Sequence, residues 1–449
     1  MTKKRLALLG VAIFLVLAGL IAWSLIFQGP DPRIEALRKQ GYPVSLAELD
    51  KAYLPVPDAE NPALACVKAF EEPFFADTGS SGGAAIDADA LPPRGQPFTD
   101  EGKKELADAL AENSEALKLL HAVPVSSRSR YPVDLTTGFN TVMPYLGKLK
   151  KAASLLGAEA ILEAAEGRTD NAVRSIQAGG RVADSLREEP LLISQLVRMA
   201  SWAVVVSRLE RAINLASFSD GQMTQLQATL ADADRLQPME RALSGELASG
   251  LAVFTSRKDG IAAFNSGVPN QAAPAQSAQL NVALTALRIT GLLAKDKAVY
   301  LQVMSTNLAA AGLPFPERLR TGKEAGSLAT TLPTRLCIFS RMLLPALSRC
   351  FLSDAYCAAR LRVAQAALGV ERYRKAHAGA LPASLQDLVP AQLVQVLTDP
   401  YDGKPLRFKR RDAGYVIYSL GRDEKDDGGL ERNPKKSGNP FDITFIVEK

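Results

Sequence analysis

The carboxylates best placed for chemistry lie in one loop near the C-terminal end of the chain. Four of them follow one another within five residues and a further one closes the loop: Asp423, Glu424, Asp426, Asp427 and Asp442. Ca²⁺ is a hard cation that takes about six to eight oxygen ligands from carboxylates and carbonyls. The loop is therefore a candidate calcium site, and Ca²⁺ is the cofactor that the sequence suggests. Because lysines and arginines in the same loop weaken its negative field, a solvated acidic loop is the alternative.

The sequence offers little for other kinds of catalysis. It contains only two histidines, His121 and His377, and each lies near the end of an expected helix, where a structural role is the default. No HExxH, P-loop or GxGxxG motif occurs. The one GxSxG string, at 79–83, lacks the strand before it and the helix after it that a nucleophile requires. We therefore lean against an enzyme, and the alternative is an envelope hydrolase that uses carboxylates or serines.

Length, charge and composition narrow the class of protein. The chain has 449 residues, 47% of them hydrophobic, and a net charge of +5 from 53 Lys+Arg against 48 Asp+Glu. This balance is typical of folded globular chains and is too weakly basic for a nucleic-acid binder, so no nucleic acid is expected as a partner. The basic run at 404–411 either faces an anionic partner or protects an edge strand from pairing.

The first 28 residues have the pattern of a single-pass membrane anchor. Lys3, Lys4 and Arg5 precede an uncharged run, 6–27, whose helix would be about 33 Å long and could cross a lipid bilayer. Basic flanks stay on the cytoplasmic side, so the bulk of the chain is expected to be periplasmic or extracellular. A cleaved secretory signal is the alternative, and it would export the same bulk.

Four cysteines, Cys66, Cys337, Cys350 and Cys357, would then meet an oxidising compartment. Cys350 and Cys357 are two helical turns apart, about 10 Å, which is too far for a disulfide between them. We expect buried thiols, and the sequence leaves open whether any of the four form disulfides.

Hydrophobic residues recur with a helical period between 100 and 353, which predicts an all-α region of antiparallel helix pairs or a bundle. A segment of short helices with a Gly/Pro-rich loop, 29–99, precedes it. The expected helices span about 100–121, 146–166, 171–186, 191–218, 238–256, 278–312 and 335–378.

Three local features refine this region. The apolar segment 191–218 contains Arg198 and Arg208, so we expect a core helix and not a second membrane span. Ser219 and Gln222 have the spacing of a capping box that opens a further helix. The hairpin at 159–186 resembles a single tetratricopeptide-type unit, without the run of repeats that a solenoid needs.

From about 354 the chain is expected to form a small α+β module. Three segments rich in β-branched and aromatic residues, at 405–411, 414–420 and 442–447, predict a three-stranded antiparallel sheet. The expected fold is therefore mainly α, with an N-terminal transmembrane helix at 1–28 and this module at 354–449.

The same module carries a series of motifs in a recognisable order. They read Leu-Pro-Ala-Ser-Leu at 381–385, Thr-Asp-Pro-Tyr-Asp-Gly-Lys-Pro-Leu at 398–406, Tyr-Ser-Leu-Gly-Arg-Asp at 418–423, Asp-Asp-Gly-Gly at 426–429 and Phe-Asp-Ile at 441–443. This succession, over about 360–449, resembles the globular part of the type II secretion major pseudopilin.

The resemblance implies a calcium site in the loop. Its side-chain ligands would be Asp423 and Asp442, with the carbonyl of Leu420 beside them, and Asp427 is a further candidate. The sequence departs from the family because Glu424 stands where glycine is usual, the anchor has no acidic residue, and a long helical stretch separates anchor and module. We therefore expect a shared fold module and neither pilus assembly nor prepilin processing.

Together these features predict an exported membrane protein whose helical region and C-terminal module bind or scaffold a protein partner at the cell envelope. The hydrolase is the alternative, and an accessory component of type II secretion is a third possibility. A deep pocket lined by carboxylates with perturbed pKa values would favour the hydrolase, whereas a broad groove would favour the scaffold.

Overall fold

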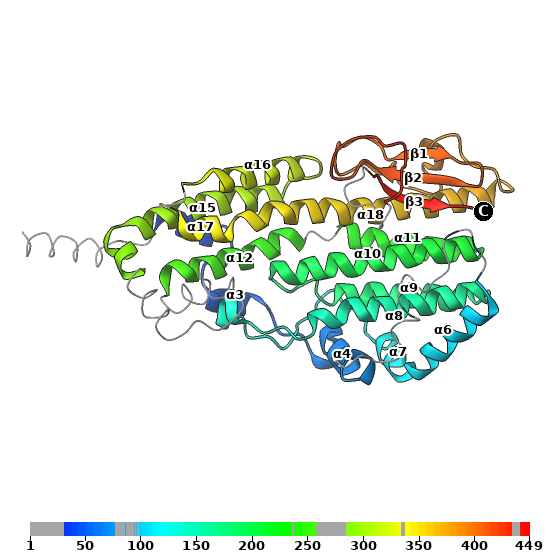
Figure 1. Ribbon diagram of the computed structural model, residues 1–449, viewed down its shortest axis with the longest axis horizontal. Helices are drawn as coiled ribbons and strands as arrows, with labels where there is room; N and C mark the ends of the chain where they lie inside the picture. Colours follow the sequence, from blue (N-terminus) through cyan, green and yellow to red (C-terminus); the bar gives the residue numbers. More distant parts are fainter. Residues whose placement is uncertain are drawn as a thin grey trace, which may run out of the picture.

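The computed structural model describes residues 31–76, 86, 94, 96, 98–235, 238–256, 284–333, 337–432 and 441–449. The predicted anchor at 6–27 and the GxSxG string at 79–83 lie outside these residues. Within them the chain is mainly helical, with a small three-stranded sheet near its C-terminal end (Figure 1). The predicted fold class is confirmed to this extent.

The helices before residue 146 are α2 (Pro32–Lys39), α3 (Leu46–Ala52), α4 (Pro62–Ala69), α6 (Asp100–Glu112) and α7 (Ser114–His121), with 3₁₀ turns η1 (Asp58–Glu60), η2 (Pro73–Phe75) and η4 (Leu135–Asn140). The central helices are α8 (Leu146–Ala165), α9 (Thr169–Asp184), α10 (Leu192–Leu215), α11 (Asp220–Arg235) and α12 (Pro238–Thr255). They are followed by α15 (Leu292–Ala311), α16 (Glu317–Thr331), α17 (Ile338–Leu343) and α18 (Pro345–Ala376). The C-terminal part holds η5 (Leu385–Leu388), β1 (Arg407–Arg410), β2 (Tyr415–Ser419) and β3 (Ile443–Val447).

The segment predicted as one helix over 100–121 is two helices. α6 ends at Glu112 and α7 begins at Ser114, and Asn113 between them has a non-helical backbone at φ −108° and ψ 21°. Its side-chain amide donates to the Ala109 carbonyl at 2.7 Å. An asparagine that bonds to the backbone in this way competes with the helix, and the hydrophobic period does not reveal it.

One predicted helix start is confirmed, and one segment predicted as a single helix consists of two helices. The Gln222 amide donates to Ser219 Oγ at 3.1 Å, and the Ser219 amide donates to Gln222 Oε1 at 2.7 Å, so the capping box opens α11 as predicted. The helix predicted at 335–378 is α17 followed by α18, because Pro345 fits the first turn of a new helix.

The central helices lie side by side along the long axis of the molecule (Figure 1). α8 and α9 form an antiparallel hairpin, and α10 packs against both. By length and composition alone α10 could cross a membrane, but 61% of its most apolar stretch is buried among the other helices. Trp202, near its centre, is 1% exposed. α10 therefore packs as a core helix, as predicted.

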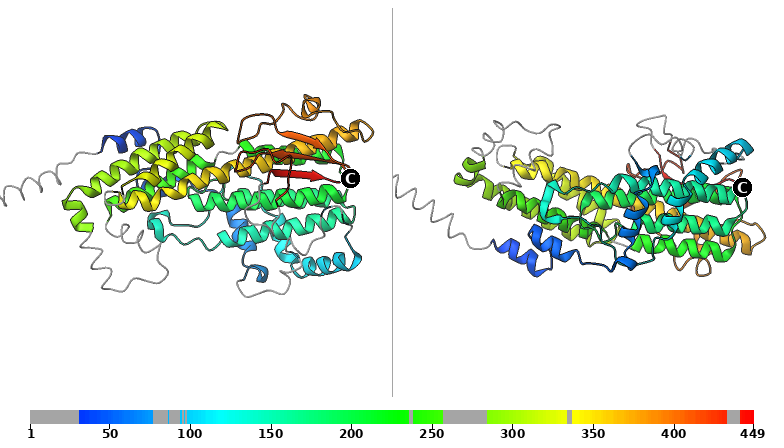
Figure 2. Two further views of the ribbon diagram at one scale, coloured as in Figure 1. Left: turned by 45° about the horizontal axis from the view of Figure 1, so that its top comes forward. Right: turned by 90° about the horizontal axis from the view of Figure 1, so that it is seen from below.

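The sheet packs against the C-terminal half of α18, a 32-residue helix that runs from the helical body into the module (Figure 2). The strand order is β1-β2-β3 and both pairs are antiparallel, with Arg407 opposite Tyr418 and Tyr415 opposite Val447. Tyr415 donates its hydroxyl to the Ala367 carbonyl of α18 at 3.1 Å. The three predicted strands are confirmed, each with slightly shorter bounds.

α10 covers the free edge of β3. Glu210 Oε1 accepts from the Ile446 amide at 3.0 Å. The Asn214 side chain donates to the Ile446 carbonyl at 2.9 Å and accepts from the Glu448 amide at 2.8 Å. These bonds satisfy backbone groups that an edge strand would otherwise leave open to pairing. The module is thus fixed to α10 as well as to α18.

The four cysteines, Cys66, Cys337, Cys350 and Cys357, are free and buried. Burial raises the pKa of the Cys66, Cys350 and Cys357 thiols to about 12, so these thiols are protonated and poor nucleophiles. The expectation of buried thiols is confirmed.

Candidate functional site

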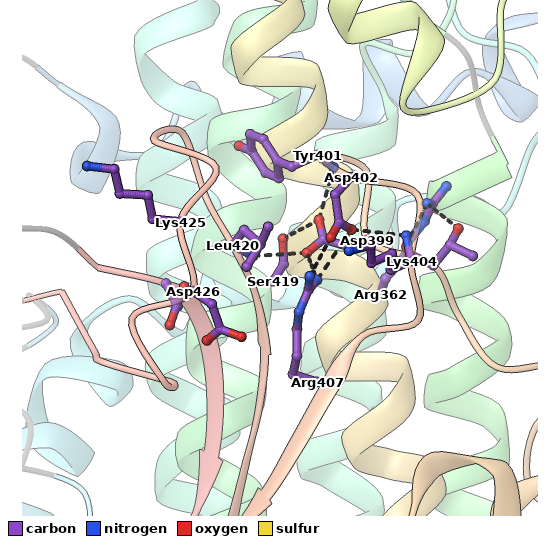
Figure 3. A network of polar contacts seen from close by, with 12 residues as sticks. Arg362, Asp399, Tyr401, Asp402, Lys404, Arg407, Ser419, Leu420, Lys425 and Asp426 are labelled. Carbon is purple, nitrogen blue, oxygen red and sulfur yellow. Dashed lines mark hydrogen bonds and ion pairs between the residues drawn. The ribbon is translucent and has the colours of Figure 1, made fainter.

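The C-terminal module is organised around Asp399, a residue for which the sequence predicted no separate role. Asp399 is fully buried, at 0% exposure. Its Oδ1 accepts from the Tyr401 amide at 2.9 Å and from Ser419 Oγ at 2.8 Å. Its Oδ2 accepts from the Leu420 amide at 2.9 Å and from Arg407 Nη1 at 2.5 Å. Figure 3 shows these contacts converging on one carboxylate.

Arg407 joins this carboxylate to the turn that precedes β1. Its Nη2 donates to Asp402 Oδ2 at 2.5 Å, so the guanidinium bridges two aspartates. The turn closes at Gly403, which has a φ of +74° and donates its amide to the Asp399 carbonyl at 2.9 Å. Because the buried charge is paired and fully hydrogen-bonded, the network is a structural support for the loops around it.

The acidic loop leaves the sheet directly from this network. Leu420, a predicted carbonyl ligand, follows β2 and is held through its amide by Asp399. Gly421 then takes a left-handed backbone, with φ +79°, and the chain turns away. Lys425 and Asp426 lie further along the loop, apart from the Asp399 network (Figure 3). The start of the loop is therefore rigidly placed by a buried ion pair.

Asp427 and Asp442, two of the predicted ligands, lie close together. Asp442 is 1% exposed, and its Oδ2 accepts from the Gly429 amide at 2.7 Å. Asp442 Oδ1 and Asp427 Oδ2 are both buried without a hydrogen-bond donor. Burial, together with the negative charges of Asp427 and Asp426, raises the pKa of Asp442 to about 6. Buried carboxylate oxygens that lack donors are what a bound cation would satisfy.

Asp423, the remaining predicted side-chain ligand, is not part of this pair. Its side chain is exposed and its Oδ1 accepts from the Lys425 amide at 3.4 Å. Its neighbour Glu424 forms an ion pair with Lys323 of α16 and has a left-handed backbone, with φ +57°. Glycine adopts that backbone without strain. Glu424, with its left-handed backbone, thus stands where the pseudopilin family usually has glycine.

The described residues contain no group of three or more His, Cys, Asp or Glu side chains that could hold a metal ion. A calcium site in this loop would therefore rest on Asp427 and Asp442. The remainder of its shell would be carbonyl and water oxygens, which Ca²⁺ accepts readily. The buried unpaired oxygens fit such a site, whereas the exposed Asp423 does not contribute to it in this conformation.

A second polar cluster joins α7 to the α8–α9 hairpin. His121 Nε2 lies 2.6 Å from Glu159 Oε2, and Ser175 Oγ donates to the same oxygen at 2.7 Å. The three side chains line a recess of about 420 Å³. Both groups bind the carboxylate, no hydrogen bond joins His121 to Ser175, and Ser175 is only 1% exposed. The cluster thus lacks the contact between nucleophile and base that a serine hydrolase requires.

Comparisons of the chain with protein-family models, with curated proteins and with solved structures find no match. The likeness of 360–449 to the pseudopilin family and of 159–186 to a tetratricopeptide unit therefore rests on the sequence motifs alone.

Proposed function

We propose that this chain is a single-pass, exported membrane protein that binds or scaffolds a protein partner at the cell envelope through its helical body and pseudopilin-like module. The observation that carries the proposal is the continuity of α18. Its N-terminal half packs on α16, where Phe351 lies against Gly322, and its C-terminal half packs on β2, where Ala367 bonds to Tyr415. One helix thus holds two surfaces in a fixed relation, as a scaffold requires.

The proposed orientation predicts that the module is reachable from outside the cytoplasmic membrane. Lys425 is exposed and the native thiols are buried, so a Lys425→Cys variant of the full chain carries one reactive thiol. We expect a membrane-impermeant maleimide to label it in spheroplasts that have not been permeabilised. Thr2→Cys, on the basic flank, should be labelled only after permeabilisation. The reverse pattern would contradict the orientation, and recovery of both variants in the soluble fraction would contradict the anchor.

We also propose Ca²⁺ as a ligand of the loop, bound by the carboxylates of Asp427 and Asp442. Binding to the folded chain alone adds about 2.7 kcal/mol to the free energy of unfolding when free Ca²⁺ is roughly 100-fold above Kd. We expect Ca²⁺ at about 1 mM, the range of extracellular calcium modules, to raise the melting temperature of the full chain. The shift should shrink below about pH 6, because Asp442 must lose its proton to bind the metal.

Two aspartate variants provide the control for this prediction. Asp442→Asn should abolish the calcium-dependent shift, yet without calcium it should be at least as stable as the wild type, because it removes a buried carboxylate oxygen that has no donor. Asp423→Asn should retain the shift, because its side chain is exposed. If Asp423→Asn loses the shift instead, the loop rearranges to the ligand set of the pseudopilin family. If the wild type shows no shift, the calcium proposal is wrong.

A further inference from the structure

A groove of about 680 Å³ lies over α10, between α8 and α18, and Arg422 of the acidic loop forms part of its lining. Its cationic lining comes from four separate parts of the chain: Lys150 of α8, Arg208 of α10, Arg360 of α18 and Arg422 of the loop. The lining contains no aspartate or glutamate. This volume is within the range of ligand pockets in proteins, about 300–1,000 Å³. A groove of this charge selects an anion.

The Arg208 guanidinium is buried and donates through Nη2 to the Ile86 carbonyl at 3.2 Å, so the charge open to a ligand comes from the other three cations. Lys150 and Arg422 are exposed and have no hydrogen bond or ion pair with the described residues. Arg360 donates through Nη2 to the Ala203 carbonyl at 3.2 Å, while its Nε is buried without a partner. Glu210, whose carboxylate is influenced by the charge of Arg360, is bonded to Arg94 at 3.0 Å. Positive charge is therefore available at the groove.

The floor of the groove along α10 is apolar. Leu196 and Met199 line the end nearer the start of the helix, and Ile193, one turn earlier, is 48% exposed. Ser207 and Arg208 line the other end, about 18 Å away from Leu196 along the helix axis. The bond from Arg360 to Ala203 places the Arg360 guanidinium beside the middle of this floor. An apolar floor and cationic side chains thus line the same groove.

We propose that this groove binds a single-chain amphiphilic anion, an acyl chain that ends in a carboxylate or phosphate. The acyl chain would lie along the apolar floor on α10, and the headgroup would be held by Arg360 and Arg422. Burial of each methylene contributes about 0.8 kcal/mol, and a charged headgroup adds charge-assisted hydrogen bonds from the guanidinium groups. The proposal rests on the groove alone and does not require calcium in the neighbouring loop.

Photoaffinity labelling of the full chain in amphipol tests the proposal at the level of individual peptides. The probe is a twelve-carbon fatty acid with a diazirine in mid-chain. We expect labelled peptides from 196–207 of α10, and competition by dodecanoate or dodecyl phosphate but not by dodecanol. Competition by only one of the two anions would identify the headgroup. Labelling spread over the chain or confined to 6–27, or equal competition by dodecanol, would overturn the proposal.

Charge variants complete the test. Arg360→Gln combined with Arg422→Gln should reduce labelling of α10 by about tenfold or more, since each charge-assisted hydrogen bond is worth about 1.5–3 kcal/mol. Arg422→Glu is a second variant at an exposed position and should weaken labelling in the same direction without affecting folding. Lys404→Glu makes the same change of charge at an exposed position of the module outside the groove and should leave labelling unchanged. Equal labelling of Arg422→Glu and Lys404→Glu would overturn the proposal.

Discussion

Replacing Asp399 with alanine is expected to unfold the C-terminal module while the helical body stays folded. The substitution removes the acceptor of two backbone amides, a serine hydroxyl and the Arg407 guanidinium. Arg407 then keeps Asp402 as its carboxylate partner. Breaking a buried ion pair by removing one partner costs about 3–5 kcal/mol, because the groups left behind are desolvated and unpaired. A loss of that size is a large fraction of the stability of a small structural unit.

Hydrogen exchange followed by mass spectrometry measures this effect separately in each part of the chain. We expect amides of β2 and β3 to exchange about 100-fold faster in Asp399→Ala, which corresponds to roughly 3 kcal/mol, while amides of α8 and α9 stay protected. Asp402→Asn is the matched control, because it alters the partly exposed partner of the same arginine. The Asp402→Asn substitution should lower the free energy of unfolding of the module by about 1 kcal/mol or less. Equal loss of protection in α8 and α9 would show that the module does not unfold separately.

The strands were predictable because their pattern is local, whereas the packing around them was not. β-branched and aromatic residues between turn residues mark β1, β2 and β3 within a few positions. By contrast, Glu210 and Asn214 have no distinctive context within α10, yet they bind the edge of β3. The hydrogen bond from Ile446 to Glu210 joins residues 236 positions apart. Hydrophobic periodicity is a local signal and cannot predict a contact between residues so far apart in the sequence, so this contact is seen only in the folded structure.

The candidate site, like the fold, was predictable from the sequence only in part. Carboxylates close in sequence identified the acidic loop, but the backbone of the loop decides which of them meet, so Asp427 reaches Asp442 and Asp423 does not. Asp399 was missed because an aspartate before proline is typical of an ordinary turn. Its partner Arg407 belonged to a basic run predicted to face an anionic partner or protect an edge strand. In the structure Arg407 is instead committed to Asp399 and Asp402.

The second large effect is expected from Glu189, a carboxyl group buried where α9 leads into α10. Its side chain is 0% exposed. Oε1 accepts from the Tyr145 hydroxyl at 2.9 Å and from Ser194 Oγ at 2.5 Å, while Oε2 is buried without a partner. Burial raises the pKa of Glu189 to about 7, although the two hydroxyl donors favour the charged form. The folded protein thus retains a proton that the unfolded chain loses near pH 4.5.

A group whose pKa is higher in the folded state contributes stability below its unfolded pKa, and that contribution is lost as the pH rises through the folded pKa. The free energy of unfolding should therefore fall between about pH 4.5 and pH 7, by up to about 3 kcal/mol from this group. Glu189→Gln keeps the shape of the side chain and cannot ionise. We expect it to melt with the wild type at about pH 4 and at a higher temperature than the wild type at about pH 8.

Thermal melting followed by circular dichroism at several pH values tests this, and the difference between wild type and variant isolates the one carboxyl group from all others. The neighbouring Glu188→Gln is the matched control, because Glu188 is partly exposed and paired with Arg241 at 3.0 Å. Exposed pairs contribute about 0–1 kcal/mol, so this variant should keep the pH dependence of the wild type. If Glu189→Gln also keeps it, Glu189 is ionised in the folded protein at neutral pH. The two hydroxyl donors would then outweigh the cost of burying its charge.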